Sequence, residues 1–354
     1  MKHRLASWLR SLAIIAGVTL LLDFSITAFI PNAYLEDLRS THSPDDANYR
    51  TGVPWHHELK PDLRTQRYWG PIGYPFASDE LGFRTGACAG SDPRREHDNT
   101  VFVVGDSFTE GIAVPFEESF AGLLACAYRE HGMVVRNLGT LGYSPTIYYR
   151  KIEESVRRLG FAPREIIVFL DMSDIHNDAV DFTDLGSSVV AQAPTSGRKV
   201  KEFLKRNFMS ASLASKLWLT AWRHYLMPPV STLADWTSDP GAFERWGRAG
   251  LAANERNLQR IVDQCGAWKC RMTLVVYPWP PQILQGDQES LQVRHWRAWS
   301  AARDIRFVNA FPPFFTLPPK EAVARYYIDG DVHFTAAGNR LLFDAVWPSL
   351  RPAN

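Results

Sequence analysis

Two short segments far apart in the chain hold residue types that can perform nucleophilic chemistry. The first is Gly105-Asp106-Ser107, which directly follows an apolar run at residues 101–104. A serine placed where a buried strand gives way to a helix has an exposed hydroxyl and a free backbone amide. A serine that only caps the next helix would give the same local pattern.

The second segment supplies what a serine nucleophile lacks. A serine hydroxyl is a weak nucleophile until a base removes its proton, and a carboxylate must hold that base in the correct tautomer. Asp329, Asp331 and His333 lie together just before the last helical pattern. The residues therefore predict Ser107 as nucleophile, His333 as base and Asp331 as orienting acid, with Asp329 as the competing acid.

The elements around these segments indicate an α/β domain. Short apolar runs alternate with amphipathic stretches from residue 100 onward, as in a parallel sheet with covering helices. We expect strands at residues 101–104, 134–138, 166–170, 272–276 and 305–308, and helices at residues 116–131, 146–159, 243–265, 290–303 and 336–347. Because parallel strands share one carboxyl edge, this sheet can bring the two segments together.

The stretch Gly-Asp-Ser-Phe-Thr-Glu-Gly at residues 105–111 resembles the nucleophile block of the SGNH or GDSL hydrolase superfamily, and the resemblance covers residues 79–347. It implies an α/β, three-layer, flavodoxin-like fold with a central parallel sheet, and no cofactor. It also places the Ser107 amide in an oxyanion hole. Residues 137–145 are similar to the second block of the family, which implies that the Gly142 amide belongs to the same hole.

The third block, usually Gly-x-Asn-Asp, is replaced here, so the third oxyanion donor has two candidates. Ser173 takes the position of the usual Asn if Asp174 is aligned with the Asp of the block, whereas Asn177 serves if the loop is shifted. Asp174, His176 and Asp178 also invite a metal interpretation. Three scattered ligands are a weak metal signal, and we expect no metal.

The last block has Asp-x-His instead of the usual Asp-x-x-His. This spacing resembles a subset of the superfamily related to alginate O-acetylation proteins, which act on exopolysaccharides. It implies an esterase that acts on acyl esters, such as O-acetyl groups of a carbohydrate. Two alternatives remain open: an O-acetyltransferase of a cell-surface polysaccharide, served by a membrane-embedded acyl donor protein, and a non-catalytic scaffold of a polysaccharide export system.

Two further residues are candidates for substrate binding. Arg84 ends a Leu-Gly-Phe-Arg turn similar to one that precedes the catalytic strand in exported relatives, and we expect it to pack or to contact substrate. Trp279 lies in a proline-rich turn after an expected strand. Its ring offers a flat apolar face on which a sugar could stack, although a structural role is the alternative.

The N-terminus indicates membrane attachment. Residues 12–30 are almost continuously apolar and follow Lys2, Arg4 and Arg10. This pattern predicts a transmembrane anchor at residues 1–30 with a cytoplasmic N-terminus and an extracytoplasmic catalytic domain. Asp23 inside the span lies near the outer interface or contacts another membrane protein.

The remaining chain is divided by composition. Residues 31–98 form an expected loop-rich lead-in, and residues 99–352 form the hydrolase-like domain, in which residues 181–240 are an expected helical insertion or lid. An apolar fraction of 45% and a charged fraction of 22% fit a globular protein. The net charge of +1 provides no field that would attract nucleic acid.

The four cysteines predict two disulfides. An even number of cysteines suits a chain outside the cytoplasm. Cys265 and Cys270 can close a small loop, which leaves Cys88 to pair with Cys126.

Overall fold

The structure is a computed structural model that describes residues 2–29, 48–88, 99–182 and 230–352. The chain divides into two compact units. One comprises residues 1–42, 67–73 and 192–229, and the other comprises residues 43–66, 74–191 and 230–354. The second unit contains the main sheet and both segments that carry the expected chemistry.

The described part of the first unit consists mainly of helix α1 (Lys2–Phe29). This helix covers the apolar segment in which the sequence predicted an anchor. Within the described ranges, no helix combines the length and the apolar character needed to cross a bilayer. The predicted transmembrane span is therefore not confirmed.

The core of the second unit is a five-stranded parallel sheet. Its strands are β5 (Thr100–Val104), β6 (Val134–Asn137), β7 (Glu165–Leu170), β8 (Arg271–Val276) and β9 (Arg306–Asn309). They lie in the order β6-β5-β7-β8-β9, with every neighbouring pair parallel. Counted along the chain this is the order 2-1-3-4-5, which defines a flavodoxin-like sheet. The central parallel sheet predicted from the sequence is confirmed.

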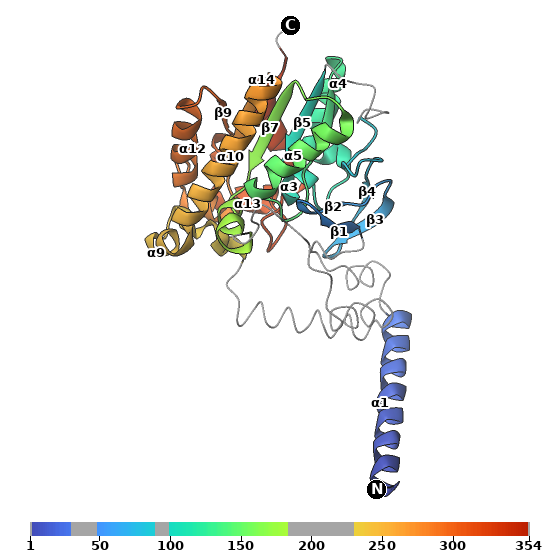
Figure 1. The fold of residues 1–354 in the computed structure, drawn as a ribbon. Helices are drawn as coiled ribbons and strands as arrows, with labels where there is room; N and C mark the ends of the chain where they lie inside the picture. The colour runs from blue at the N-terminus through green and yellow to red at the C-terminus, as the bar shows by residue number, and fades with distance from the viewer. Residues whose placement is uncertain (1, 30–47, 89–98, 183–229, 353–354) are drawn as a thin grey trace. The chain divides into compact units, whose positions relative to one another are not determined.

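Helices cover both faces of this sheet. The main ones are α4 (Phe120–Glu130), α5 (Pro145–Leu159), α10 (Arg248–Trp268), α12 (Leu291–Ala301) and α14 (Ala336–Leu350). Right-handed connections put α4 and α5 on opposite faces, because the chain moves outward from β5 to β6 and then back past β5 to β7. Helix α4 packs on α14, and α5 packs on α10, giving three layers; α5 and α10 lie in front in Figure 1.

Shorter helices connect these elements. They are α3 (Ser107–Glu110), α6 (Asp174–His176), α9 (Pro240–Ala242), α11 (Pro280–Gln285) and α13 (Pro319–Tyr326). Three further segments are 3-10 helices, η1 (Phe116–Glu118), η3 (Val230–Thr237) and η5 (Pro312–Phe315), and two are π-helices, η2 (Asn177–Asp181) and η4 (Phe243–Gly247). The sequence analysis did not predict α11 and α13, whose first residues are prolines. Most of the expected insertion at residues 181–240 lies outside the described residues.

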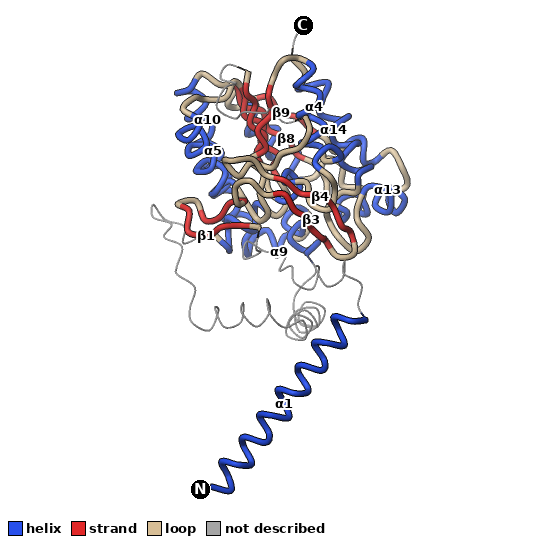
Figure 2. Tube along the Cα trace, turned by 90° about the vertical axis from the view of Figure 1, so that its right-hand side faces the viewer, coloured by secondary structure: helices blue, strands red, loops and turns tan. Residues whose placement is uncertain are grey.

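The lead-in region differs from the expected loop. Its described residues form β1 (Tyr49–Val53), β2 (His56–Leu59), β3 (Arg64–Trp69) and β4 (Ile72–Ala77). Strands β1 and β2 pair antiparallel, and β1 lies apart from β8 and β9 in Figure 2. The prediction was wrong because β2 buries His57 and Glu58, so the strand lacks the apolar alternation that indicates a strand.

Both expected cysteine pairs are bonded in the structure. Cys88 is joined to Cys126 in α4, and Cys265 is joined to Cys270 at the end of α10. The first bond fastens the lead-in region to the helical layer, and the second closes the turn between α10 and β8.

Candidate active site

Ser107 lies at the point where the sheet order reverses. Its strand β5 has β6 on one side and β7 on the other, and α4 and α5 leave in opposite directions. In open α/β sheets the crevice at such a reversal, outside the carboxyl ends of the strands, is where ligands bind. The fold therefore presents Ser107 at the position where chemistry is expected.

The local turn is built to expose the serine. Asp106 caps α3 by accepting a hydrogen bond from the Phe108 amide at 3.0 Å, so Ser107 becomes the first helical residue. Gly105 before it permits close packing, because a Cβ there would meet the Thr109 hydroxyl at 2.0 Å. The backbone can thus turn sharply directly after the strand.

The structure brings the second segment to this turn. His333 Nε2 lies 2.9 Å from Ser107 Oγ, and His333 Nδ1 lies 2.7 Å from Asp331 Oδ1. A carboxylate only accepts, so Nδ1 carries the proton and Nε2 presents its lone pair to the serine. This arrangement can deprotonate Ser107.

Asp331 is itself held in place by its own turn. Its Oδ1 also accepts from the amides of Val332 at 2.6 Å and His333 at 3.0 Å. Asp329, the competing acid, is exposed, whereas Asp331 makes the contact with the histidine. The geometry favours Asp331 as the orienting acid.

Aromatic rings form a wall behind the histidine. The Phe108 ring lies 4.8 Å from the His333 ring, 5.0 Å from Phe334 and 6.2 Å from Trp279. Trp279 is only 2% exposed, and its Nε1 donates to Asp171 Oδ2 at 2.7 Å. The expectation that this tryptophan stacks on a sugar is therefore wrong, because its faces are covered by the protein.

Arg84 is likewise a structural residue and not a substrate contact. It is 1% exposed, and it donates to the backbone carbonyls of Glu110, Gly111 and Val114, the last at 2.7 Å. Its guanidinium carbon also lies 4.7 Å from the centre of the Phe76 ring. Arg84 satisfies the carbonyls at the end of α3, and a substrate cannot reach it.

The second block lies along the nucleophile turn. The Leu138 amide donates to the Val103 carbonyl at 2.8 Å, and the Thr140 amide donates to the Gly105 carbonyl at 3.3 Å. Gly142 follows with a φ of 73°, a left-handed conformation that suits glycine. Among the hydrogen bonds of the described residues, none uses the amides of Ser107 or Gly142. The oxyanion hole expected at these two amides stays a prediction.

The two candidates for the third donor lie in different surroundings. Ser173 follows β7, the strand next to β5, and its hydroxyl donates to Asp171 Oδ1 at 2.6 Å. Asn177 lies further along, in η2, and its amide group donates to Asp181 Oδ2 at 2.7 Å. Ser173 is therefore the candidate that shares the edge of the sheet with Ser107.

The acidic residues of the third block hold the scaffold together. Asp174 accepts from the Tyr148 hydroxyl at 2.9 Å, and Asp178 accepts from Asn254 of α10 at 2.9 Å and from Ser144. Burial raises the pKa of both carboxyl groups. Across the described ranges, no three His, Cys, Asp or Glu side chains are arranged to hold a metal ion.

A pair of buried carboxyl groups lies directly beneath the serine. Burial raises the pKa of Asp106, and the nearby Asp171 raises it further. Burial also raises the pKa of Asp171. The negative charge of one carboxylate thus makes ionisation of the other less favourable.

Three residues of the site were missed by sequence reasoning. Glu110 belongs to the nucleophile block but received no role; its carboxylate accepts from the Tyr49 hydroxyl at 2.8 Å and from the Leu141 amide at 2.7 Å. Asp171 binds Ser173, as described above. His57 lies 2.8 Å from the Leu141 carbonyl through Nε2. Only Glu110 carried a signal, namely a second acid, besides Asp106, inside the nucleophile block.

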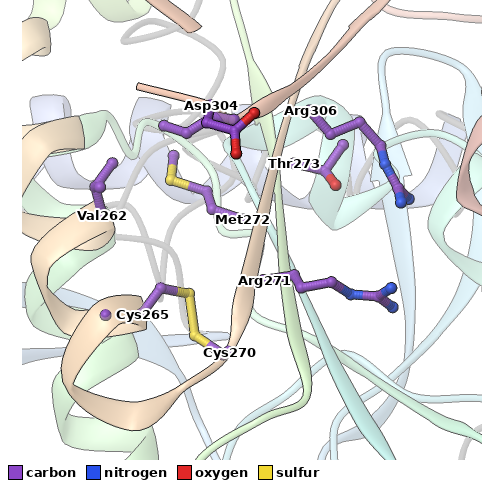
Figure 3. A pocket seen from close by; sticks show the side chains of 10 residues that line it. Val262, Cys265, Cys270, Arg271, Met272, Thr273, Asp304 and Arg306 are labelled. Carbon is purple, nitrogen blue, oxygen red and sulfur yellow. A yellow bond between two sulfur atoms is a disulfide. The ribbon is translucent and has the colours of Figure 1, made fainter. Parts of the chain in front are cut away.

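Two surface cavities lie away from this site. One, of about 550 Å³, is lined by the Cys265–Cys270 disulfide, Arg271 and Arg306, as Figure 3 shows. A second, of about 540 Å³, shares Arg271 and Arg306. Both arginines begin their strands, so these cavities lie at the amino edge of the sheet, opposite Ser107.

Comparisons with known proteins find similarity only among solved structures. No protein-family model matches the sequence, and no curated protein matches it. The acetylxylan esterase Axe2 from Geobacillus stearothermophilus is 17% identical, with 73% of this chain and 97% of that chain covered and a TM-score of 0.42. A GDSL-like lipase from Bacteroides thetaiotaomicron is 15% identical, with 71% and 87% covered and a TM-score of 0.37.

A third similar structure is the alpha/beta hydrolase LAE5 from the metagenome of Lake Arreo, at 13% identity. It has 73% of this chain and 97% of that chain covered, with a TM-score of 0.42. Identities and TM-scores this low do not determine an activity or a substrate. The function of this chain has to be inferred from the geometry around Ser107.

Proposed function

We propose that this chain is a serine esterase that acts on acyl esters through Ser107, His333 and Asp331. One observation carries the proposal: His333 contacts the serine hydroxyl with one ring nitrogen and a carboxylate with the other. A histidine that only capped or packed would not need a fixed tautomer with its basic nitrogen on a serine at the edge of a sheet.

The steps follow from these contacts. His333 Nε2 takes the Ser107 proton while Oγ attacks the ester carbonyl carbon, and the resulting oxyanion accepts from the amides of Ser107 and Gly142. The imidazolium returns the proton to the leaving alcohol, which leaves an acyl-serine. A water molecule, deprotonated by His333 Nε2, then attacks the acyl carbon; the bond to Ser107 Oγ breaks, Oγ takes the proton back from His333, and the acid is released. Each oxyanion donor is worth about 3 kcal/mol in the transition state.

The proposal also specifies the substrate and the cellular location of the protein. We propose an O-acetyl group of a carbohydrate as the ester and an extracytoplasmic location for the domain. The two disulfides support an oxidising compartment. The basic residues ahead of the apolar run support attachment of residues 1–30 to the membrane.

The chemistry is tested with p-nitrophenyl acetate and a fluorophosphonate probe. We expect wild-type protein to release nitrophenol and to be labelled on Ser107, and we expect Ser107→Ala and His333→Ala to lose at least about a thousandfold in kcat. The melting temperature should change little, since neither side chain belongs to the apolar core. A folded wild-type protein that neither hydrolyses the ester nor takes the label would contradict the proposal and favour a scaffold.

The same assay with added glycans tests whether the acyl group is transferred to water or to a glycan hydroxyl. An esterase releases acetate at a rate independent of the glycan, whereas a transferase consumes donor faster and yields acetylated glycan. Membrane attachment is tested by fractionating cells that express the full chain or a chain without residues 1–30. Equal recovery of both forms in the soluble fraction would contradict attachment.

A further inference from the structure

The peptide that joins Leu141 and Gly142 is held on its carbonyl side by a buried histidine. The Leu141 carbonyl lies 2.8 Å from His57 Nε2, and the Leu141 amide donates to Glu110 Oε2 at 2.7 Å. The Gly142 amide belongs to the same planar unit as that carbonyl. The described residues contain no cis peptide, so the Gly142 N–H points away from the carbonyl that His57 contacts.

The direction of this hydrogen bond follows from its partners. A carbonyl oxygen only accepts, so His57 Nε2 must carry a proton. Burial, followed by the charges of His56 and Lys151, lowers the pKa of His57 to about 3, so the ring is neutral and its Nδ1 has a lone pair. His57 Nδ1 lies 2.7 Å from His56 Nδ1, which must therefore donate. His56 therefore donates to His57, and His57 donates to the Leu141 carbonyl.

The surroundings leave His57 little freedom to move. Its side chain is fully buried, with its ring 4.9 Å from Tyr143 and 5.8 Å from Tyr49. The Tyr143 hydroxyl donates to the His57 backbone carbonyl. Since a buried polar ring costs free energy unless it is hydrogen-bonded, this contact is a specific one.

We propose that His57 is a positioning residue that aims the Gly142 amide at the oxyanion, with His56 fixing its tautomer. This inference rests on the proposed function, because the Gly142 amide matters only if an oxyanion forms at Ser107. An oxyanion donor contributes when its direction is set before the reaction. His57 sets that direction through the planarity of one peptide, without touching substrate.

The test compares His57→Leu with His57→Gln, whose side-chain amide can still donate to the Leu141 carbonyl. We expect His57→Leu to lower kcat on p-nitrophenyl acetate roughly ten- to a hundredfold with little change in KM, because the lost contact acts in the transition state. His57→Gln should restore kcat to within about threefold of wild type. A boronic acid inhibitor forms a tetrahedral adduct that places an oxygen in the oxyanion hole. Its affinity for the His57→Leu variant should be lower than for wild type by a similar factor.

Tyr143→Phe is the matched control. It removes a hydrogen bond from the same contact between β2 and the second block but leaves the Leu141 carbonyl bonded. We expect it to lower the melting temperature and to leave kcat within about twofold. His56 is half-buried, and His56→Ala removes the hydrogen bond that it donates to His57. This variant should lower kcat severalfold, and it can be measured even if His57→Leu fails to fold.

The outcomes separate this inference from the function on which it rests. If wild type is active, Ser107→Ala is inactive and His57→Leu keeps wild-type kcat, the positioning role is overturned and the esterase stands. If His57→Leu, His57→Gln and Tyr143→Phe all lose kcat in proportion to their melting temperatures, the residue is only structural and the inference is also overturned. If Ser107→Ala retains hydrolysis, the proposed function fails instead.

Discussion

Ser107 is served by two regions that are built in opposite ways. The base segment, residues 331–333, is one short turn in which the acid and the base lie two positions apart and bond each other directly. The oxyanion segment, residues 138–142, is held by side chains from distant parts of the chain, including His57 of β2 and Glu110 of α3. One region is local and the other is assembled by the fold.

The side chains of the two regions also differ in how deeply they are buried. The side chains of Asp331 and His333 are 25% and 10% exposed, whereas those of His57 and Glu110 are fully buried. Substitutions in the base segment should therefore change activity with little cost in stability. Substitutions behind the oxyanion segment should change both, because they leave buried polar groups without partners.

The largest expected effect belongs to the base segment. Asp331→Asn replaces the acceptor of the His333 Nδ1 proton with a group that can stabilise the wrong tautomer. We expect kcat to fall roughly a thousand- to ten-thousandfold, with an unchanged melting temperature. Steady-state kinetics on p-nitrophenyl acetate measure this loss.

Asp329→Asn is the control for that change, because Asp329 is an exposed acid two residues earlier in the same turn. It should retain wild-type kcat. The reverse ranking of the two variants would show that the base segment rearranges when substrate binds.

The next effect is on the stability of the domain that carries both regions. Cys88 and Cys126 are 38 positions apart, and Cys265 and Cys270 are 5 apart. Loop entropy predicts that Cys88→Ser/Cys126→Ser costs about 4 kcal/mol and Cys265→Ser/Cys270→Ser about 2 kcal/mol in the free energy of unfolding. Urea denaturation of both double variants measures the difference, and equal losses would argue against the entropic account.

The local region is the one that sequence could predict. Asp331 and His333 are informative because a triad needs an acid beside a base, and this pair is adjacent in the chain. The five strands were predicted for a similar reason. The three central strands, β5, β7 and β8, are short apolar runs such as residues 166–170 and are buried on both faces along nearly their whole length. The right-handed crossover rule limits how such runs can be ordered.

The assembled region could not be predicted in the same way. His57 and Glu58 are buried polar residues in β2, and each has a partner more than eighty positions away, namely the Leu141 carbonyl and Lys151. Arg84 and Trp279 were candidates for substrate contacts, with a structural role as the alternative, because arginine and tryptophan often bind ligands. Their burial depends on which carbonyls and carboxylates the fold places around them, and no local pattern encodes that.

The pH dependence of stability provides a smaller test of the oxyanion segment. The pKa of His57 is about 3 in the folded protein and near 6.5 when unfolded. Between these values the unfolded state binds more protons, so stability is lost as pH falls through this window. From pH 7 to pH 5, wild type should lose about 2 kcal/mol more than His57→Gln in the free energy of unfolding.

The buried acids Asp106 and Asp171 work in the opposite direction. Their raised pKa values make the folded state bind more protons, so they favour stability as pH falls. Comparing wild type with His57→Gln removes this contribution, because both proteins contain the same acids. Parallel pH profiles for the two proteins would mean that His57 is not held neutral.

The smallest effect concerns the third oxyanion donor, at the boundary between the two regions. Ser173 follows β7, which is hydrogen-bonded to the strand that carries Ser107, whereas the Asn177 side chain is bonded to the half-exposed Asp181. We expect Ser173→Ala to lower kcat roughly tenfold, less than the loss of a free oxyanion donor, because the hydroxyl must give up its bond to Asp171 to reach the oxyanion. Asn177→Ala should leave kcat within about twofold. The opposite ranking would mean that the loop after β7 shifts by a turn when substrate binds. If both variants kept wild-type kcat, the Ser107 and Gly142 amides would form the hole alone, and the precise aim of Gly142 by His57 would matter more.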